Sequence, residues 1–99
     1  MKIKYSHSLS LHEAYRRVSN LLAELQNKYS EYISNPQIKW NADNTKMDFS
    51  MEVKGFSVKG KIILTDKLIT VEGELPFLAR IFKGKIEAYI MEALEKLFK

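Results

Sequence analysis

Two histidines are the first residues of this sequence whose type could support catalysis or metal binding. His7 and His12 lie near the start of the chain, and no carboxylate accompanies them at a spacing typical of a metal site. Their position at the junction of a predicted strand and a predicted helix favours a turn or surface role over that of a general base or ligand. Cysteine is absent, which excludes disulfides and thiolate chemistry.

One pair of carboxylates could also do chemistry. Glu72 and Glu74 alternate along a predicted strand, so their side chains share one face of the sheet. Such a pair could act as the acid and base of a hydrolase. Lys59 and Lys61 on the neighbouring predicted strand favour instead a row of solvent-exposed ion pairs. We therefore predict that the protein is not an enzyme and has no catalytic residues, no metal and no cofactor.

The charge pattern argues against nucleic acid as a partner. The chain has 16 basic and 12 acidic residues, mixed along its length, for a net charge of +4. Lys39, Lys46, Lys59 and Lys61 could follow a phosphate backbone. No aromatic residue alternates with them on the solvent face, however, so base stacking has no platform. A mixed, solubilising surface is the simpler interpretation.

Length and composition predict one globular domain over residues 1–99, with 45% hydrophobic residues. Lys2, Lys4, Ser6 and His7 interrupt the start, so we expect no signal peptide. No apolar stretch is long enough to span a bilayer. Together with the absence of cysteine, these features lead us to expect a cytoplasmic protein.

The hydrophobic periodicity predicts the order β-α-β-β-β-β-α. A strand at residues 3–6 precedes a capping box formed by Ser10 and Glu13. A helix with one apolar stripe follows to about Tyr32, and Asn35-Pro36 ends it. Four alternating segments at 38–40, 46–53, 56–64 and 68–75 then predict strands with one buried and one solvent-exposed face. A second helix covers about 77–98. The fold class is α+β, an antiparallel sheet with two long helices packed on one face.

Turn lengths predict the register of the middle strands. Two-residue turns at Lys54-Gly55 and at 66–67 place Phe49 opposite Gly60, and Gly60 opposite Gly73, on the buried face. A helix backbone could come close there, or Phe49 or Trp40 could cover the gap. Alternatively, the missing side chains could leave a small apolar pocket. The candidate pocket residues are thus Phe49, Gly60, Gly73 and Trp40.

The start of the last predicted helix carries more apolar side chains than one buried stripe needs. Phe77 and Ile81 fall off the stripe that contains Leu78, Phe82 and the later apolar residues. We predict that they form a contact surface for an apolar partner, together with Arg80, Lys83 and Lys85. They could equally plug the open end of the sheet. Gly84 weakens the helix, which suggests a close packing contact or a bend.

A family resemblance adds to these patterns. The motifs that carry it are His7-Ser8-Leu9 before a long helix, Gly55 and Gly60 around a strand start, Leu78, and the segment Phe82-Lys83-Gly84-Lys85-Ile86-Glu87. In these motifs the chain resembles the small bacterial family of polyhydroxyalkanoic acid system proteins. The resemblance covers nearly the whole chain and implies a link to intracellular polyester granules, with no catalytic residues to transfer. The element order also resembles a shortened helix-grip fold, whose larger members hold apolar ligands between a curved sheet and a long C-terminal helix. This resemblance places the first strand beside the strand at 68–75.

Two functional hypotheses follow. The first is a non-catalytic interaction protein that docks on a polyhydroxyalkanoate granule, a lipid or a protein partner, a second copy of the chain included. The alternative is a small helix-grip carrier that binds an apolar ligand between the sheet and the C-terminal helix. An open cavity over the glycine pair would favour the carrier, whereas a filled core with Phe77 and Ile81 exposed would favour the docking protein.

Overall fold

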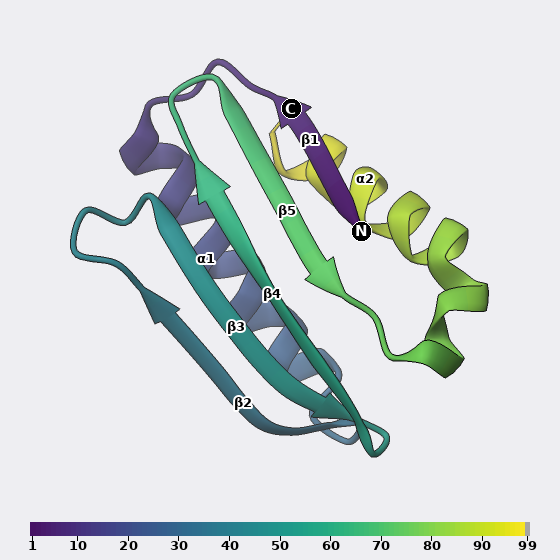
Figure 1. The fold of residues 1–99 in the computed structure, drawn as a ribbon. Helices are drawn as coiled ribbons and strands as arrows, with labels where there is room; N and C mark the ends of the chain where they lie inside the picture. The colour runs from purple at the N-terminus through teal and green to yellow at the C-terminus, as the bar shows by residue number, and fades with distance from the viewer. Residues whose placement is uncertain (99) are drawn as a thin grey trace.

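A computed structural model describes residues 1–98 of the chain; the side chain of Leu78, expected in the core, lies outside the described part. The α+β class and the predicted element order are confirmed (Figure 1). The elements are β1 (Lys2–Ser6), α1 (Leu11–Lys28), β2 (Ile33–Trp40), β3 (Lys46–Val53), β4 (Phe56–Leu64), β5 (Leu68–Glu74), a 3₁₀ helix η1 (Phe77–Phe82) and α2 (Lys83–Leu97). Among the described residues, no helix is long and apolar enough to cross a membrane.

The five strands form one antiparallel sheet in the order β1-β5-β4-β3-β2. The predicted place of the first strand is confirmed, since Ile3 pairs with Val71 of β5. The backbone of Met1 extends this pairing, because its ammonium donates to the carbonyl of Gly73 at 3.1 Å. Both helices lie on the same side of the sheet, α1 behind β3 and β4, and α2 beside β1 (Figure 1).

Short turns fix the register of the middle strands. Lys54 and Gly55 have φ angles of +50° and +84°, as the two central residues of a type I′ hairpin require. Val53 therefore pairs with Phe56. At the next turn, the amide of Thr65 donates to the carbonyl of Leu68 at 2.9 Å. Both predicted two-residue turns are thus confirmed.

The predicted end of the first helix was wrong. α1 begins as expected, with the amide of Glu13 donating to the Ser10 hydroxyl, but it ends at Lys28. Residues from Ile33 onward already pair with β3, and Asn35-Pro36 lies inside β2 at a shift of register. β2 is an edge strand, where a proline without an N–H group is tolerated, and Asn35 takes the bulge conformation with φ of 52°.

The predicted last helix is also divided. The segment from Phe77 to Phe82 is a 3₁₀ helix, and the α-helix begins only at Lys83. The chain changes direction between the two (Figure 1). A close packing contact at Gly84 was a wrong prediction, because a Cβ atom added there would meet nothing within 4 Å. The alternative prediction, a bend, fits the position of Gly84 next to the junction between η1 and α2.

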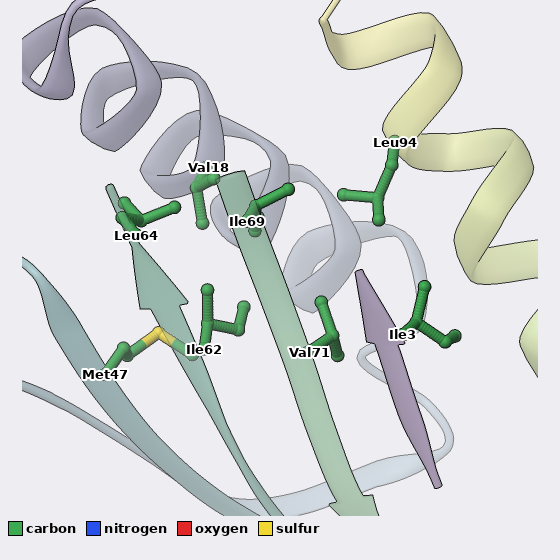
Figure 2. Packing of buried hydrophobic residues seen from close by; sticks show 8 residues of the cluster. All are labelled: Ile3, Val18, Met47, Ile62, Leu64, Ile69, Val71 and Leu94. Carbon is green, nitrogen blue, oxygen red and sulfur yellow. The ribbon is translucent and has the colours of Figure 1, made fainter. Parts of the chain in front are cut away.

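The core lies between the middle of the sheet and the two helices. Figure 2 shows Val18 of α1 and Leu94 of α2 on the same side as the apolar residues of the strands. The buried cluster consists of Ile3, Val18, Met47, Ile62, Leu64, Ile69, Val71 and Leu94. The core is narrower than the sequence predicts, since only Ala14 and Val18 of the α1 stripe are fully buried.

Candidate functional site

The glycine pair lies where the register places it. Phe49 pairs with Gly60, and Gly60 pairs with Gly73. A Cβ atom on Gly60 would come within 2.5 Å of Cζ of Phe49, so the phenylalanine ring covers this glycine. The side chain of Met1 covers Gly73 in the same way, with Cε 3.0 Å from a Cβ atom there. These two side chains occupy the space that the glycines leave.

Trp40, the fourth candidate pocket residue, lies elsewhere. It pairs with Met47 rather than with Phe49, and its ring meets Tyr15 edge-on at 4.7 Å between centroids. The other three border an open depression of about 1050 Å³ whose remaining lining is largely polar and charged, including Lys39, Asp48, Lys61 and Glu72. This depression differs in chemistry from a small apolar pocket.

The carboxylates Glu72 and Glu74 face lysines across the sheet. The register pairs Lys61 with Glu72 and Lys59 with Glu74, as the ion-pair interpretation requires. Lys2 on the other neighbouring strand also reaches Glu72, with Nζ 3.4 Å from Oε1. The two glutamates therefore belong to a row of alternating charges on the solvent face of the sheet.

His7 joins the end of β1 to the β4–β5 turn. Its Nδ1 accepts a hydrogen bond from the amide of Leu9 at 3.2 Å, so Nε2 carries the proton and donates to the carbonyl of Thr65 at 2.8 Å. The ring also stacks on Phe98 at 4.9 Å between centroids. Among the described residues, no three His, Cys, Asp or Glu side chains gather as a metal site.

The predicted contact residues lie on η1 and the start of α2. Phe77 and Ile81 are 79% and 82% exposed, and Arg80, Lys83 and Lys85 are exposed as well. Phe82 was predicted to be a core residue, but it is 50% exposed. A 3₁₀ helix has three residues per turn rather than 3.6, which rotates Phe82 away from the predicted stripe. We call these six residues, Phe77, Arg80, Ile81, Phe82, Lys83 and Lys85, the η1 surface.

The charges of the η1 surface lie beside its apolar side chains. Cζ of Arg80 lies 6.0 Å from the centroid of the Phe77 ring, at the outer limit of a cation–π contact. Nζ of Lys83 lies 3.7 Å from a carboxylate oxygen of Glu87. This exposed ion pair holds Lys83 only weakly, so the lysine can turn toward an anionic surface.

A second feature is an apolar groove between the two helices and the sheet, whose lining includes Phe49 but otherwise differs from the predicted pocket residues. It encloses about 540 Å³. Leu22 and Leu25 of α1 line one side, Ala93 and Leu97 of α2 line the other, and the sheet forms its floor. The sequence assigned these leucines to the core, whereas they are only half-buried. We call this feature the interhelical groove.

Two tyrosines border the interhelical groove. The hydroxyls of Tyr29 on α1 and Tyr89 on α2 lie 3.5 Å apart, and either can be the donor. This hydrogen bond lowers the pKa of Tyr29 and raises the pKa of Tyr89, because the Tyr89 hydroxyl stabilises the Tyr29 phenolate and keeps its own proton in doing so. The tyrosine pair therefore connects the two helices beside the groove.

Comparisons with known proteins identify the family. The family model described as "Putative polyhydroxyalkanoic acid system protein" matches residues 1–98. Neither a curated protein nor a solved structure matches the chain significantly, so the helix-grip relationship stays an expectation from element order. The match covers nearly the whole chain, and the protein thus belongs to the polyhydroxyalkanoic acid system protein family.

Proposed function

We propose that this protein is a non-catalytic, cytoplasmic interaction protein that docks through the η1 surface onto polyhydroxyalkanoate granules. The observation that carries the proposal is the exposure of Phe77 and Ile81, 79% and 82% respectively. Large apolar side chains that gather on a surface tend to mark interaction sites. The family name supplies the partner, because it links these proteins to polyhydroxyalkanoate systems.

The total surface of the chain also supports a docking role. The protein exposes 6816 Å², whereas a folded monomer of 11.5 kDa typically exposes about 5,800 Å². The excess is similar to the area of about 800 Å² that one partner buries in a standard interface. The chain thus has spare surface for a partner.

The chemistry of the η1 surface fits an apolar phase with an anionic boundary. Burial of Phe77 and Ile81 would contribute about 1.5–3 kcal/mol each. Arg80, Lys83 and Lys85 would add about 1 kcal/mol each near an anionic layer. Because association itself costs at least about 4 kcal/mol, we expect reversible binding that weakens as salt is added.

A binding assay with coated polyester particles tests this proposal. We expect wild-type protein to sediment with phospholipid-coated polyhydroxyalkanoate particles, and Phe77→Ser/Ile81→Ser to lose at least tenfold in affinity. Phe56→Ser is the matched control, since Phe56 is 42% exposed on β4 and lies outside the η1 surface. A charge variant, Arg80→Gln/Lys83→Gln/Lys85→Gln, should lose binding and its salt dependence while it keeps every apolar side chain of the η1 surface.

Two results would overturn the granule proposal. One is a folded double-serine variant that sediments with particles as well as wild type does. The other is a dimer, seen by sedimentation velocity, that only the wild type forms, since the η1 surface would then be covered by a second copy. If the double-serine variant fails to fold, the charge variant tests the granule proposal instead. Its three replaced side chains are exposed, so their replacement should leave the fold intact.

The carrier hypothesis is the second candidate. The interhelical groove supports it, since this groove lies between the sheet and the C-terminal helix, where a carrier would hold its ligand. The groove makes a more specific inference about the ligand possible.

A further inference from the structure

The interhelical groove is much larger than the small voids of a packed interior. Native interiors are packed nearly as densely as organic crystals, with few voids larger than a water molecule. The groove encloses about 540 Å³, which falls within the range of about 300–1,000 Å³ found for small-molecule sites. Its size therefore suits a small-molecule ligand.

The lining of the groove indicates the body of that ligand. Most lining residues are leucine, isoleucine, valine, methionine and alanine from α1, α2 and the sheet, and the polar groups of the lining belong to Gln26, Lys54 and three tyrosines. The hydrocarbon of Leu22, Leu25 and Leu97 offers no partner for a hydroxyl or amide group inside. A polar ligand body would lose its hydrogen bonds to water without replacement, which is unfavourable. A chain of methylene groups has no such penalty.

One charged residue lines the groove, and it indicates the head group. Among the described lining residues, Lys54 alone carries a full charge at neutral pH. It belongs to the β3–β4 turn, and its Nζ lies 4.8 Å from the centroid of the Tyr32 ring. Tyr32 also lines the groove and is 45% exposed. A cation in contact with water at the end of an apolar groove complements a ligand with a single anionic head.

We propose that the interhelical groove binds a linear aliphatic carboxylate, with its chain beneath the two helices and its carboxylate at Lys54. At about 30 Å³ for each methylene-sized group, the groove would hold at most about eighteen of them. Because part of the volume lies at the open mouth, a chain of ten to fourteen carbons, roughly, fits best. This inference does not depend on the granule proposal, because it uses different residues.

A second copy of the chain does not fit the groove. An α-helix about 10 Å wide occupies about 850 Å³ over two turns, which exceeds the volume of the groove. Tyr29 at the end of α1 and Tyr89 of α2, whose hydroxyls lie 3.5 Å apart, also bridge the two helices beside the groove. A flexible chain can enter past such side chains, whereas a folded helix would have to force α1 and α2 apart.

Calorimetric titration with sodium octanoate, decanoate and dodecanoate, each below its micelle concentration, tests the chain site. We expect affinity to rise about fourfold per added methylene, the fold-change that corresponds to about 0.8 kcal/mol. Dodecanol should bind two- to fivefold more weakly than dodecanoate, since it lacks the charge interaction with Lys54. Affinity that does not rise with chain length would overturn the proposal.

Ala93→Phe, which fills the groove from α2, should lower dodecanoate affinity at least tenfold. Its matched control is Ala88→Phe on the same helix, because Ala88 is exposed and does not line the groove. Equal losses in the two variants would contradict the site. If Ala93→Phe does not fold, Ala93→Leu is used, and dodecanoate should then raise its melting temperature less than that of wild type.

Lys54→Asn tests the head group without disturbing the turn, because asparagine accepts the positive φ that Lys54 adopts. This variant should bind dodecanoate two- to fivefold more weakly and dodecanol unchanged. Lys67→Asn, in the β4–β5 turn and away from the groove, should bind both as wild type does. An unchanged affinity of Lys54→Asn for dodecanoate would refute the assigned orientation.

The two proposals can fail separately. Phe77→Ser/Ile81→Ser should leave dodecanoate affinity unchanged, since neither residue lines the groove. A wild-type dimer that dissociates when dodecanoate binds would mean that a second copy occupies the groove, and would overturn the proposal.

Discussion

Replacing Gly60 with alanine should destabilise the fold, whereas the same change at Gly73 should not. The two glycines are direct partners across β4 and β5, so the pair compares two positions in one sheet. At Gly60, an added Cβ atom would lie 2.5 Å from Cζ of Phe49 and would also clash with the backbone carbonyl of Glu72. A rotation of Phe49 could relieve the first contact, but only a shift of the sheet could relieve the second.

The magnitudes follow from these contacts. Overpacking of this kind lowers the free energy of unfolding by about 1–3 kcal/mol. Alanine in place of glycine in a strand raises it by about 0.5–1 kcal/mol, because alanine loses less backbone entropy on folding. Gly60→Ala should therefore lose up to about 2.5 kcal/mol of unfolding free energy. At Gly73 the nearest atom is the flexible end of Met1 at 3.0 Å, and the next is 3.8 Å away. Gly73→Ala should therefore be neutral, or stabilising by up to about 1 kcal/mol.

Urea unfolding followed by the fluorescence of Trp40, the single tryptophan, measures both variants. For a domain of this size, each kcal/mol also corresponds to about 4–8 °C in melting temperature. A double variant, Phe49→Leu with Gly60→Ala, should recover part of the loss, and the cycle isolates the contribution of the ring. If Gly60→Ala is as stable as Gly73→Ala, the ring of Phe49 does not cover Gly60 and the packing argument is refuted.

Three further predictions concern single residues. Hydrogen bonds from Arg16 and then Arg17 lower the pKa of Glu13 from 4.5 to about 2, so the ionised carboxylate stabilises the folded state above pH 4.5, and this stabilisation is lost as the pH falls toward 2. The melting temperature of Glu13→Gln should therefore fall less than that of wild type between pH 4.5 and 2. An equal fall in the two proteins would contradict this prediction. Gly84→Ala should raise the unfolding free energy by up to about 1 kcal/mol, because the added methyl meets open space, and a lower urea midpoint would show that the bend needs glycine. His7→Ala should lose about 1–2 kcal/mol in the same assay, since it removes two hydrogen bonds, and an unchanged midpoint would show that neither bond stabilises the fold.

The register of the sheet was predictable because it follows from a count. The two-residue turn at Lys54-Gly55 fixes every β3–β4 pair, and the two-residue turn at 66–67 fixes every β4–β5 pair, including Gly60 opposite Gly73. The alternation of apolar residues then tells which face is buried. Both signals are local in sequence, and the only tertiary information they need is that the strands are neighbours.

The helix boundaries failed for a different reason. Pro36 predicts the end of a helix, but its effect on the backbone is equally compatible with an edge strand at a bulge. Whether residues around Pro36 end a helix or form an edge strand depends on how far β3 extends. β3 continues to Val53, which pairs with Ile33, so the strand alternative holds. At Phe82, the choice between 3₁₀ and α geometry decided which way the ring faces. Periodicity assumes 3.6 residues per turn and could not detect this difference.

The η1 surface and the interhelical groove mark the limit of sequence reasoning. The excess of apolar residues around Phe77 and Ile81 is visible in the sequence, so the prediction of a contact surface there follows from the residues alone. The groove leaves no such signal, because Leu22 and Leu25 follow the periodicity of ordinary core residues. Periodicity tells which side of a helix faces the sheet, but the distance between two helices depends on side chains that meet only in three dimensions. The charge of Lys54 could not be assigned a role from the sequence for the same reason, since only the folded hairpin brings that lysine to the wall of an apolar groove formed by residues far apart in the chain.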